Sequence, residues 1–183
     1  MEQEIKRTLF VFDFDDTIVD TASSELRVKI THVTKSGKVK THILTSDEYA
    51  SFKIPTTGKI QLNFADFETV PSDIIIKEKY FNLLTKSLEK NSKDSYTIIL
   101  TARAARNPVI DFLKNALSSR QPTVVALGTS DPYAKSSYIK KMITRFGFNE
   151  VYYYDDAKKN IDAVDELSNE YQDIEFKTYH VTD

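Results

Sequence analysis

The chain has 183 residues, 40% of them hydrophobic and only 4 Gly and 5 Pro, so it is long enough for one ordered domain but not for two. Its formal net charge of −2 excludes a global basic field, and we expect no stable bulk binding to nucleic acid, although a local basic patch is compatible with this charge. The lack of cysteine excludes disulfides, thiolate metal sites and a cysteine nucleophile.

The charged start of the chain, residues 1–7, has no apolar signal-peptide core, and no apolar run is long enough to span a bilayer. We therefore expect a soluble, cytoplasmic protein that does not enter a membrane. The composition is compatible with a monomer or with a homodimer.

Residues 9–17, Leu-Phe-Val-Phe-Asp-Phe-Asp-Asp-Thr, contain the first readable element. Apolar residues run directly into three carboxylates and a threonine, as in a buried parallel strand that ends at the ligand-binding edge of an open α/β sheet. Three acids packed this closely repel one another, so a cation would neutralise them. Oxygen ligands favour Mg²⁺ over a softer metal.

Residues 25–33 and 38–44 alternate polar and apolar side chains around Ser36-Gly37, which predicts a β-hairpin with its turn near residues 35–38. Because this hairpin follows the acidic residues, it is a candidate flap over the end of the first strand, and an edge hairpin of the sheet is the alternative. A short helix is predicted from Ser46 and a turn at residues 55–58. We interpret residues 18–72 as a small cap insertion in a single domain, 1–183.

Pro71-Ser72-Asp73 resembles a helix start, and apolar residues at helical spacing extend this predicted helix to Asn91. Strands and helices then alternate, with strands predicted at 96–101, 123–128, 151–156 and 174–181, and helices at 107–117, 136–146 and 161–167. This alternation predicts a parallel, three-layer α/β sheet with right-handed crossovers.

Four predicted strands lead to polar residues, namely Asp13 and Asp15, Thr101, Lys135, and Asp155 and Asp156. Their order and context resemble the four motifs of the haloacid dehalogenase (HAD) superfamily, whose members are mostly phosphatases. Residues 13–17 are similar to its Asp-x-Asp-x-Thr motif, and residues 154–160 to its fourth motif in the Asp-Asp form. The resemblance covers nearly the whole chain outside the insertion and implies a Rossmann-like fold with a small β-hairpin flap or cap.

The resemblance also implies Mg²⁺-dependent hydrolysis of a phosphate monoester through an aspartyl-phosphate. Asp13 would be the nucleophile, and Asp15 would protonate the leaving group and later activate water. Thr101, Lys135 and Arg103 would bind phosphate oxygens. The Mg²⁺ ligands would come from Asp13, the Phe14 carbonyl, Asp15, Asp155 and Asp156, with Asp155 bound more directly than Asp156.

Two of these roles have alternatives within the sequence. Lys140 or Lys141 would replace Lys135 if the helix that contains them begins at another residue. Asn160 is either a residue on the surface of the next helix or a hydrogen-bonding support for the acid pair.

Arg103 and Arg106 follow Thr101, where they would hold a second phosphate or a nucleotide end, or else face solvent or pair with acids such as Asp111. The expected substrate is a phosphorylated small molecule such as a nucleotide, or a nucleic-acid end. The competing function is that of a catalytically idle HAD fold that acts as a binding module.

Overall fold

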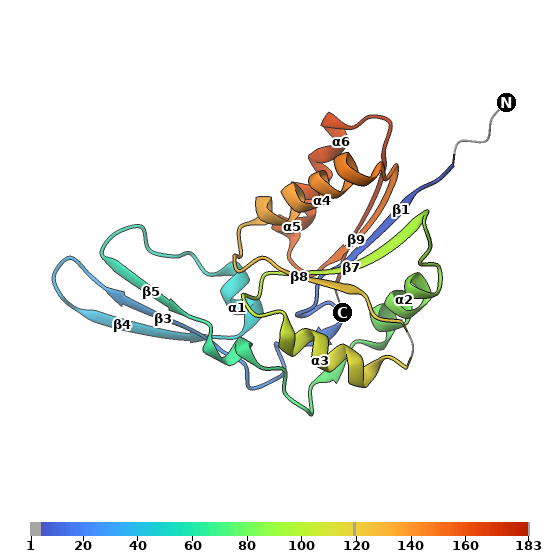
Figure 1. Ribbon diagram of the computed structural model, residues 1–183. Coiled ribbons are helices and arrows are strands. Elements are labelled where there is room, and N and C mark those ends of the chain that lie inside the picture. The colour runs from blue at the N-terminus through green and yellow to red at the C-terminus, as the bar shows by residue number, and fades with distance from the viewer. Residues whose placement is uncertain (1–4, 119, 183) are drawn as a thin grey trace.

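A five-stranded parallel sheet forms the centre of the computed structural model, which describes residues 5–118 and 120–182 (Figure 1). The spatial order is β10-β9-β1-β7-β8, so β1 lies in the middle. The strands are β1 (Thr8–Phe12), β7 (Ser95–Thr101), β8 (Thr123–Ala126), β9 (Glu150–Asp155) and β10 (Glu175–His180). The predicted parallel α/β sheet is therefore confirmed, and the arrangement is compatible with a Rossmann-like fold.

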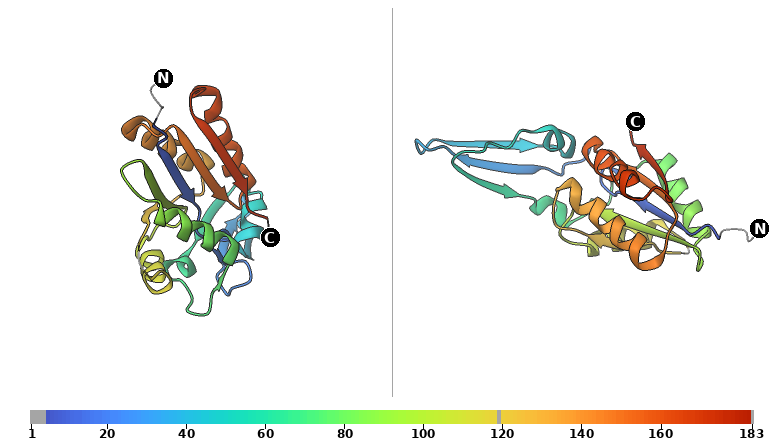
Figure 2. Two further views of the ribbon diagram at one scale, coloured as in Figure 1. Left: turned by 90° about the vertical axis from the view of Figure 1, so that its right-hand side faces the viewer. Right: turned by 90° about the horizontal axis from the view of Figure 1, so that it is seen from above.

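Helices cover both faces of this sheet (Figures 1 and 2). They are α2 (Glu78–Glu89) and α3 (Asn107–Ala116) on one face, and α4 (Pro132–Phe146), α5 (Lys158–Asp165) and α6 (Leu167–Glu170) on the other. Successive side chains of a strand point to opposite faces, so Phe12 packs in the cluster with α2 and α3, while Leu9 and Val11 pack in the cluster with α4 and α5. No helix among the described residues combines the length and the hydrophobicity that crossing a bilayer would need.

Two predicted helix starts are wrong. The helix expected from Pro71 begins at Glu78, because residues Ile75–Ile76 form the strand β6, which pairs with β2 (Val19–Asp20). The helix expected from Ser136 begins at Pro132, because the Asp131 side chain accepts a hydrogen bond from the Tyr133 main-chain N–H and caps the helix. The second difference places Lys135 inside the first turn of α4.

The insertion contains the predicted hairpin, β3 (Val28–Val33) and β4 (Val39–Leu44), and the predicted short helix α1 (Ser46–Ser51). Thr45 and Glu48 form a capping box at the start of α1. The alternative of an edge hairpin in the central sheet is wrong, since β3 also pairs with β5 (Lys59–Asn63), a strand that the sequence did not predict, in a separate sheet. A 3₁₀ helix, η1 (Ala65–Glu68), follows β5.

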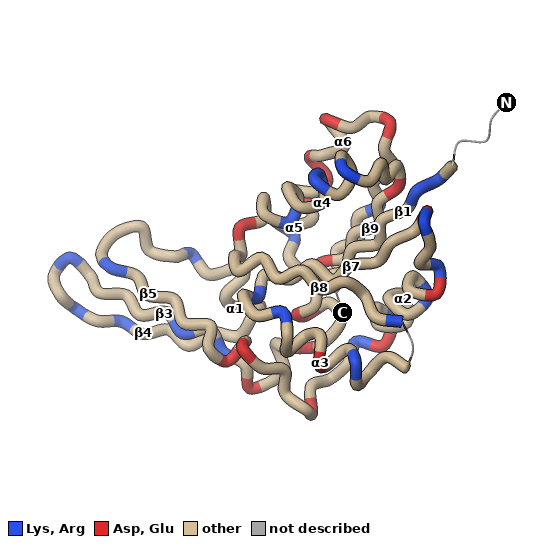
Figure 3. Tube along the Cα trace, viewed as in Figure 1, with Lys and Arg blue, Asp and Glu red and all other residues tan. Residues whose placement is uncertain are grey.

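The three-stranded sheet β4-β3-β5 projects from the central sheet, and we call it, with the turn at residues 34–38, the arm (Figures 1 and 2). Basic and no acidic residues lie along its strands (Figure 3). The base of the arm returns to the central domain through η1 and β6, so residues of the insertion lie beside the carboxyl ends of the central strands.

Candidate functional site

The site begins in the sharp turn that follows β1. The Asp13 main-chain N–H donates to the Tyr154 carbonyl at 2.9 Å, which fixes Asp13 beside the end of β9. Asp16 adopts a left-handed conformation with φ of 55°, and Ile18 N–H donates to the Phe14 carbonyl at 2.9 Å. This turn presents the aspartates at the carboxyl edge of the sheet, as the sequence predicted.

Lys135 lies between two of these acids. Its Nζ is 2.8 Å from Asp13 Oδ1 and 2.7 Å from Asp155 Oδ2, and all three residues are buried. Burial lowers the pKa of Lys135, but the two aspartates outweigh this effect and raise it above its ordinary value. Of the alternatives, Lys141 is exposed, and Lys140 is half-buried and pairs with Glu170. Of the three lysines, the structure therefore places Lys135 at the acidic residues.

Both carboxylate oxygens of Asp155 accept hydrogen bonds from groups of the protein. In addition to Lys135, the carboxylate accepts hydrogen bonds from the Asn160 amide at 2.9 and 3.1 Å, from the Ala157 N–H at 2.9 Å and from the Tyr153 hydroxyl. Asn160 is buried and supports the acid pair, so its alternative as a surface residue is wrong. This bonding orients Asp155 and occupies both of its oxygens.

Asp156 differs from its neighbour, because no donor among the described residues contacts its carboxylate. One carboxylate oxygen from each of Asp13, Asp155 and Asp156 lies within 4.8 Å of the other two. Burial, reinforced by the neighbouring acids, raises the pKa of Asp13 to about 7 and that of Asp156 to about 9. The carboxylate of Asp156 is therefore open, in the sense that no donor from the described part of the chain occupies it. This favours Asp156 over Asp155 as the direct metal ligand, contrary to the expectation from the sequence.

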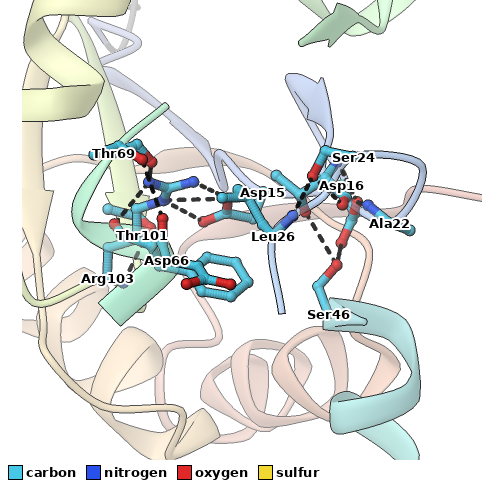
Figure 4. A network of polar contacts seen from close by, with 12 residues as sticks. Asp15, Asp16, Ala22, Ser24, Leu26, Ser46, Asp66, Thr69, Thr101 and Arg103 are labelled. Carbon is cyan, nitrogen blue, oxygen red and sulfur yellow. Dashed lines mark hydrogen bonds and ion pairs between the residues drawn. The ribbon is translucent and has the colours of Figure 1, made fainter. Parts of the chain in front are cut away.

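A different partner holds Asp15 (Figure 4). Arg103 donates to its carboxylate through Nε at 2.9 Å and through Nη2 at 2.7 Å, while Nη1 donates to the carbonyls of Phe67 and Thr69 at 2.8 and 2.7 Å. The Asp15 carboxylate therefore does not join the acidic cluster as the expected metal ligand. Arg103 is buried and neither faces solvent nor pairs with Asp111, and because its nitrogens are occupied, its contacts do not support the expected phosphate-binding role.

Two further expected site residues, Phe14 and Thr101, accept hydrogen bonds from main-chain N–H groups. The Phe14 carbonyl accepts hydrogen bonds from Ile18 and Val19, at 2.9 and 3.2 Å, so both lone pairs are occupied and the contacts do not support it as a metal ligand. Thr101 is buried at the end of β7, where its hydroxyl oxygen accepts from the Arg103 N–H at 3.2 Å. Thr101 thus lies at the same sheet edge as Asp13.

Asp16 is a residue whose structural role the sequence reasoning missed. Its carboxylate accepts from the N–H groups of Thr21 and Ala22 at 2.8 Å and from the Ser46 hydroxyl at the start of α1 (Figure 4). Lys77 Nζ donates to its carbonyl at 3.0 Å. Asp16 therefore ties the insertion to the site. Its place in the acidic run was a signal, but nothing in the sequence indicated Ser46 as a partner.

A cavity of about 550 Å³ lies between the insertion and the central domain, next to Asp15 and Arg103. Aromatic rings of the insertion line it, including Tyr49 and Phe64, whose centroids are 5.3 Å apart in an edge-to-face arrangement. The cavity therefore borders the pair of Asp15 and Arg103.

Comparisons of the chain with protein-family models, with curated proteins and with solved structures gave no match. The fold and the site define a mixed α/β protein, compatible with a Rossmann-like fold, with a buried acidic cluster that could bind a metal ion.

Proposed function

We propose that this chain is a Mg²⁺-dependent phosphatase of the HAD superfamily that hydrolyses a phosphate monoester through an aspartyl-phosphate. The observation that carries the proposal is the contact between buried Asp13 and Lys135, 2.8 Å apart, beside the open carboxylate of Asp156. A nucleophilic carboxylate, a phosphate-binding cation and a metal ligand are thereby gathered at one sheet edge. This is the set that the sequence motifs imply.

The donor set fits Mg²⁺, because it consists of carboxylate oxygens. The single positive charge of Lys135 also does not neutralise three carboxylates. Asp13 and Asp156 would hold the ion, while Asp155 would hold Lys135. When bound, Mg²⁺ reduces the repulsion between Asp13 and a phosphate dianion and polarises the phosphoryl group.

The chain's residues can carry out both halves of the reaction. Asp13 attacks phosphorus, the bond from phosphorus to the leaving oxygen breaks, and protonated Asp15 gives its proton to that oxygen. Asp15 then takes a proton from water, which attacks the aspartyl-phosphate, so that inorganic phosphate leaves and Asp13 is restored. Lys135 and Thr101 stabilise the negative charge on the phosphoryl oxygens.

The test is phosphate release from a panel of nucleotides, sugar phosphates, phosphopeptides and oligonucleotides phosphorylated at the 3′ or 5′ end. We expect turnover with Mg²⁺ that EDTA and Asp13→Asn each abolish. Asp173→Asn is the matched control, since Asp173 is exposed just before β10, at the opposite edge of the sheet. Folded protein that binds a phosphorylated molecule but releases no phosphate would favour the idle binding module instead.

A further inference from the structure

The arm concentrates positive charge in a protein whose formal net charge is −2. Residues 28–44 and 59–63 contain no Asp or Glu and five lysines, which are Lys29, Lys35, Lys38, Lys40 and Lys59. All five are exposed, and none forms an ion pair with the described residues, whereas lysines such as Lys140, Lys158 and Lys177 do pair with acids. The arm therefore offers unneutralised charge to a polyanion.

Two lysines in the strands of the arm, Lys29 and Lys59, continue from the cavity beside the site. Lys29 pairs in register with Asn63, which lines the cavity, and Lys59 pairs with Val33 nearer the tip. Since alternate residues of a strand share a face, Lys29 and Lys59 lie on the same face of the arm. Strands of six residues span about 20 Å, so charges at the base and at the tip can contact different phosphates of one chain.

The cavity itself is not suited to a second phosphate. Its charged lining consists of Asp15, Glu68 and Arg103, and Arg103 is already paired with Asp15. The rings of Tyr49 and Phe64 instead provide a surface on which an uncharged, planar group can stack. The group next to the scissile phosphate is therefore expected to be a neutral ring system such as a nucleoside.

From these two features we propose that the arm binds the sugar-phosphate backbone of a single-stranded polynucleotide, whose terminal nucleoside occupies the cavity and whose terminal phosphate lies at Asp13. This inference rests on the proposed phosphatase function for the last contact only. A mononucleotide would use the cavity and leave the five lysines without a partner. An anionic membrane or an acidic protein could use the charge, but neither would use the stacking surface.

The kinetic test compares a 3′-phosphorylated or 5′-phosphorylated oligonucleotide of about 12 residues, as DNA and as RNA, with the corresponding mononucleotide. We expect kcat/KM for the preferred oligonucleotide to exceed that for the mononucleotide by about tenfold at low salt, and to fall steeply as salt increases. In Lys35→Glu/Lys38→Glu the ratio of the two values should fall by about tenfold. Lys93→Glu/Lys141→Glu, which changes the same charge at the opposite sheet edge, should keep the ratio.

Binding is measured separately, by fluorescence anisotropy of the unphosphorylated oligonucleotide with Asp13→Asn protein in EDTA. Loss of binding in the arm variant but not in the control would support the inference even if no substrate is turned over, in which case the phosphatase proposal alone fails. Equal ratios and equal affinities in the two charge variants would overturn it. Tighter binding to phosphatidylserine vesicles than to the oligonucleotide would also overturn it, in favour of a membrane surface.

Discussion

Replacing Arg103 with lysine should lower kcat/KM for alkyl phosphates much more than kcat/KM for p-nitrophenyl phosphate. In the structure, Arg103 donates to both oxygens of Asp15 and also to the carbonyls of Phe67 and Thr69, at distances between 2.7 and 2.9 Å. A lysine ammonium is a single point of charge and cannot span the carboxylate and the two carbonyls. Asp15 would then lose its fixed position.

The size of the effect follows from the role proposed for Asp15. General acid catalysis contributes a factor of about 10² to 10⁴, and a misplaced acid should lose about 10-fold to 100-fold in kcat/KM, or about 1.4 to 2.7 kcal/mol of barrier. A p-nitrophenolate leaves without being protonated, so kcat/KM for p-nitrophenyl phosphate should fall by less than about threefold. The water attack that Asp15 also assists follows the formation of the aspartyl-phosphate and does not enter kcat/KM.

The assay measures kcat and KM for both substrates with Arg103→Lys and with Arg106→Lys, the latter being the control because Arg106 is exposed. Thermal unfolding of both variants checks that the buried substitution leaves the protein folded at the assay temperature. If Arg103→Lys lowers kcat/KM for the two substrates by the same factor, Arg103 does not act through the general acid, and the proposed link between Arg103 and Asp15 chemistry is wrong.

Three further predictions concern stability. Lys135→Met should lower the free energy of unfolding by about 3 kcal/mol in urea titrations, because it leaves two buried aspartates without their cation; an unchanged value would contradict the buried pairing. Burial opposes ionisation of Glu150, but hydrogen bonds, led by that from Lys177, lower its pKa from 4.5 to about 2. Its stabilising effect should therefore be complete above pH 4.5 and lost as the pH falls toward 2, and Glu150→Gln should remove this dependence. Gly58→Ala should destabilise the arm, detectable as faster amide exchange there, since Gly58 has φ of +85° and a Cβ would lie 2.3 Å from the Val33 carbonyl oxygen.

The sequence predicted the elements whose signal is local. A run such as Ile98-Ile99-Leu100 is apolar and flanked by β-branched threonines, as in a strand covered on both faces, and the structure contains β7 there. The hairpin of the arm was visible from its alternation and its Ser-Gly turn. In contrast, β5 has one partly buried residue among exposed ones, so it has no clear pattern of its own and depends on pairing with β3.

The sequence by itself determined that acids, a threonine and a lysine follow the ends of successive strands. Because parallel strands bring their carboxyl ends to one edge of the sheet, these residues must lie at the same edge. Only the tertiary structure decided how these groups pair. Arg103 reaches Asp15 from 88 residues away, and Lys135 reaches Asp155 across 20 residues. Hydrophobic periodicity records which face of an element is buried, but it does not record which polar groups meet across elements. Those contacts provide hydrogen-bond donors to both oxygens of the Asp155 carboxylate, and none among the described residues to the carboxylate of Asp156.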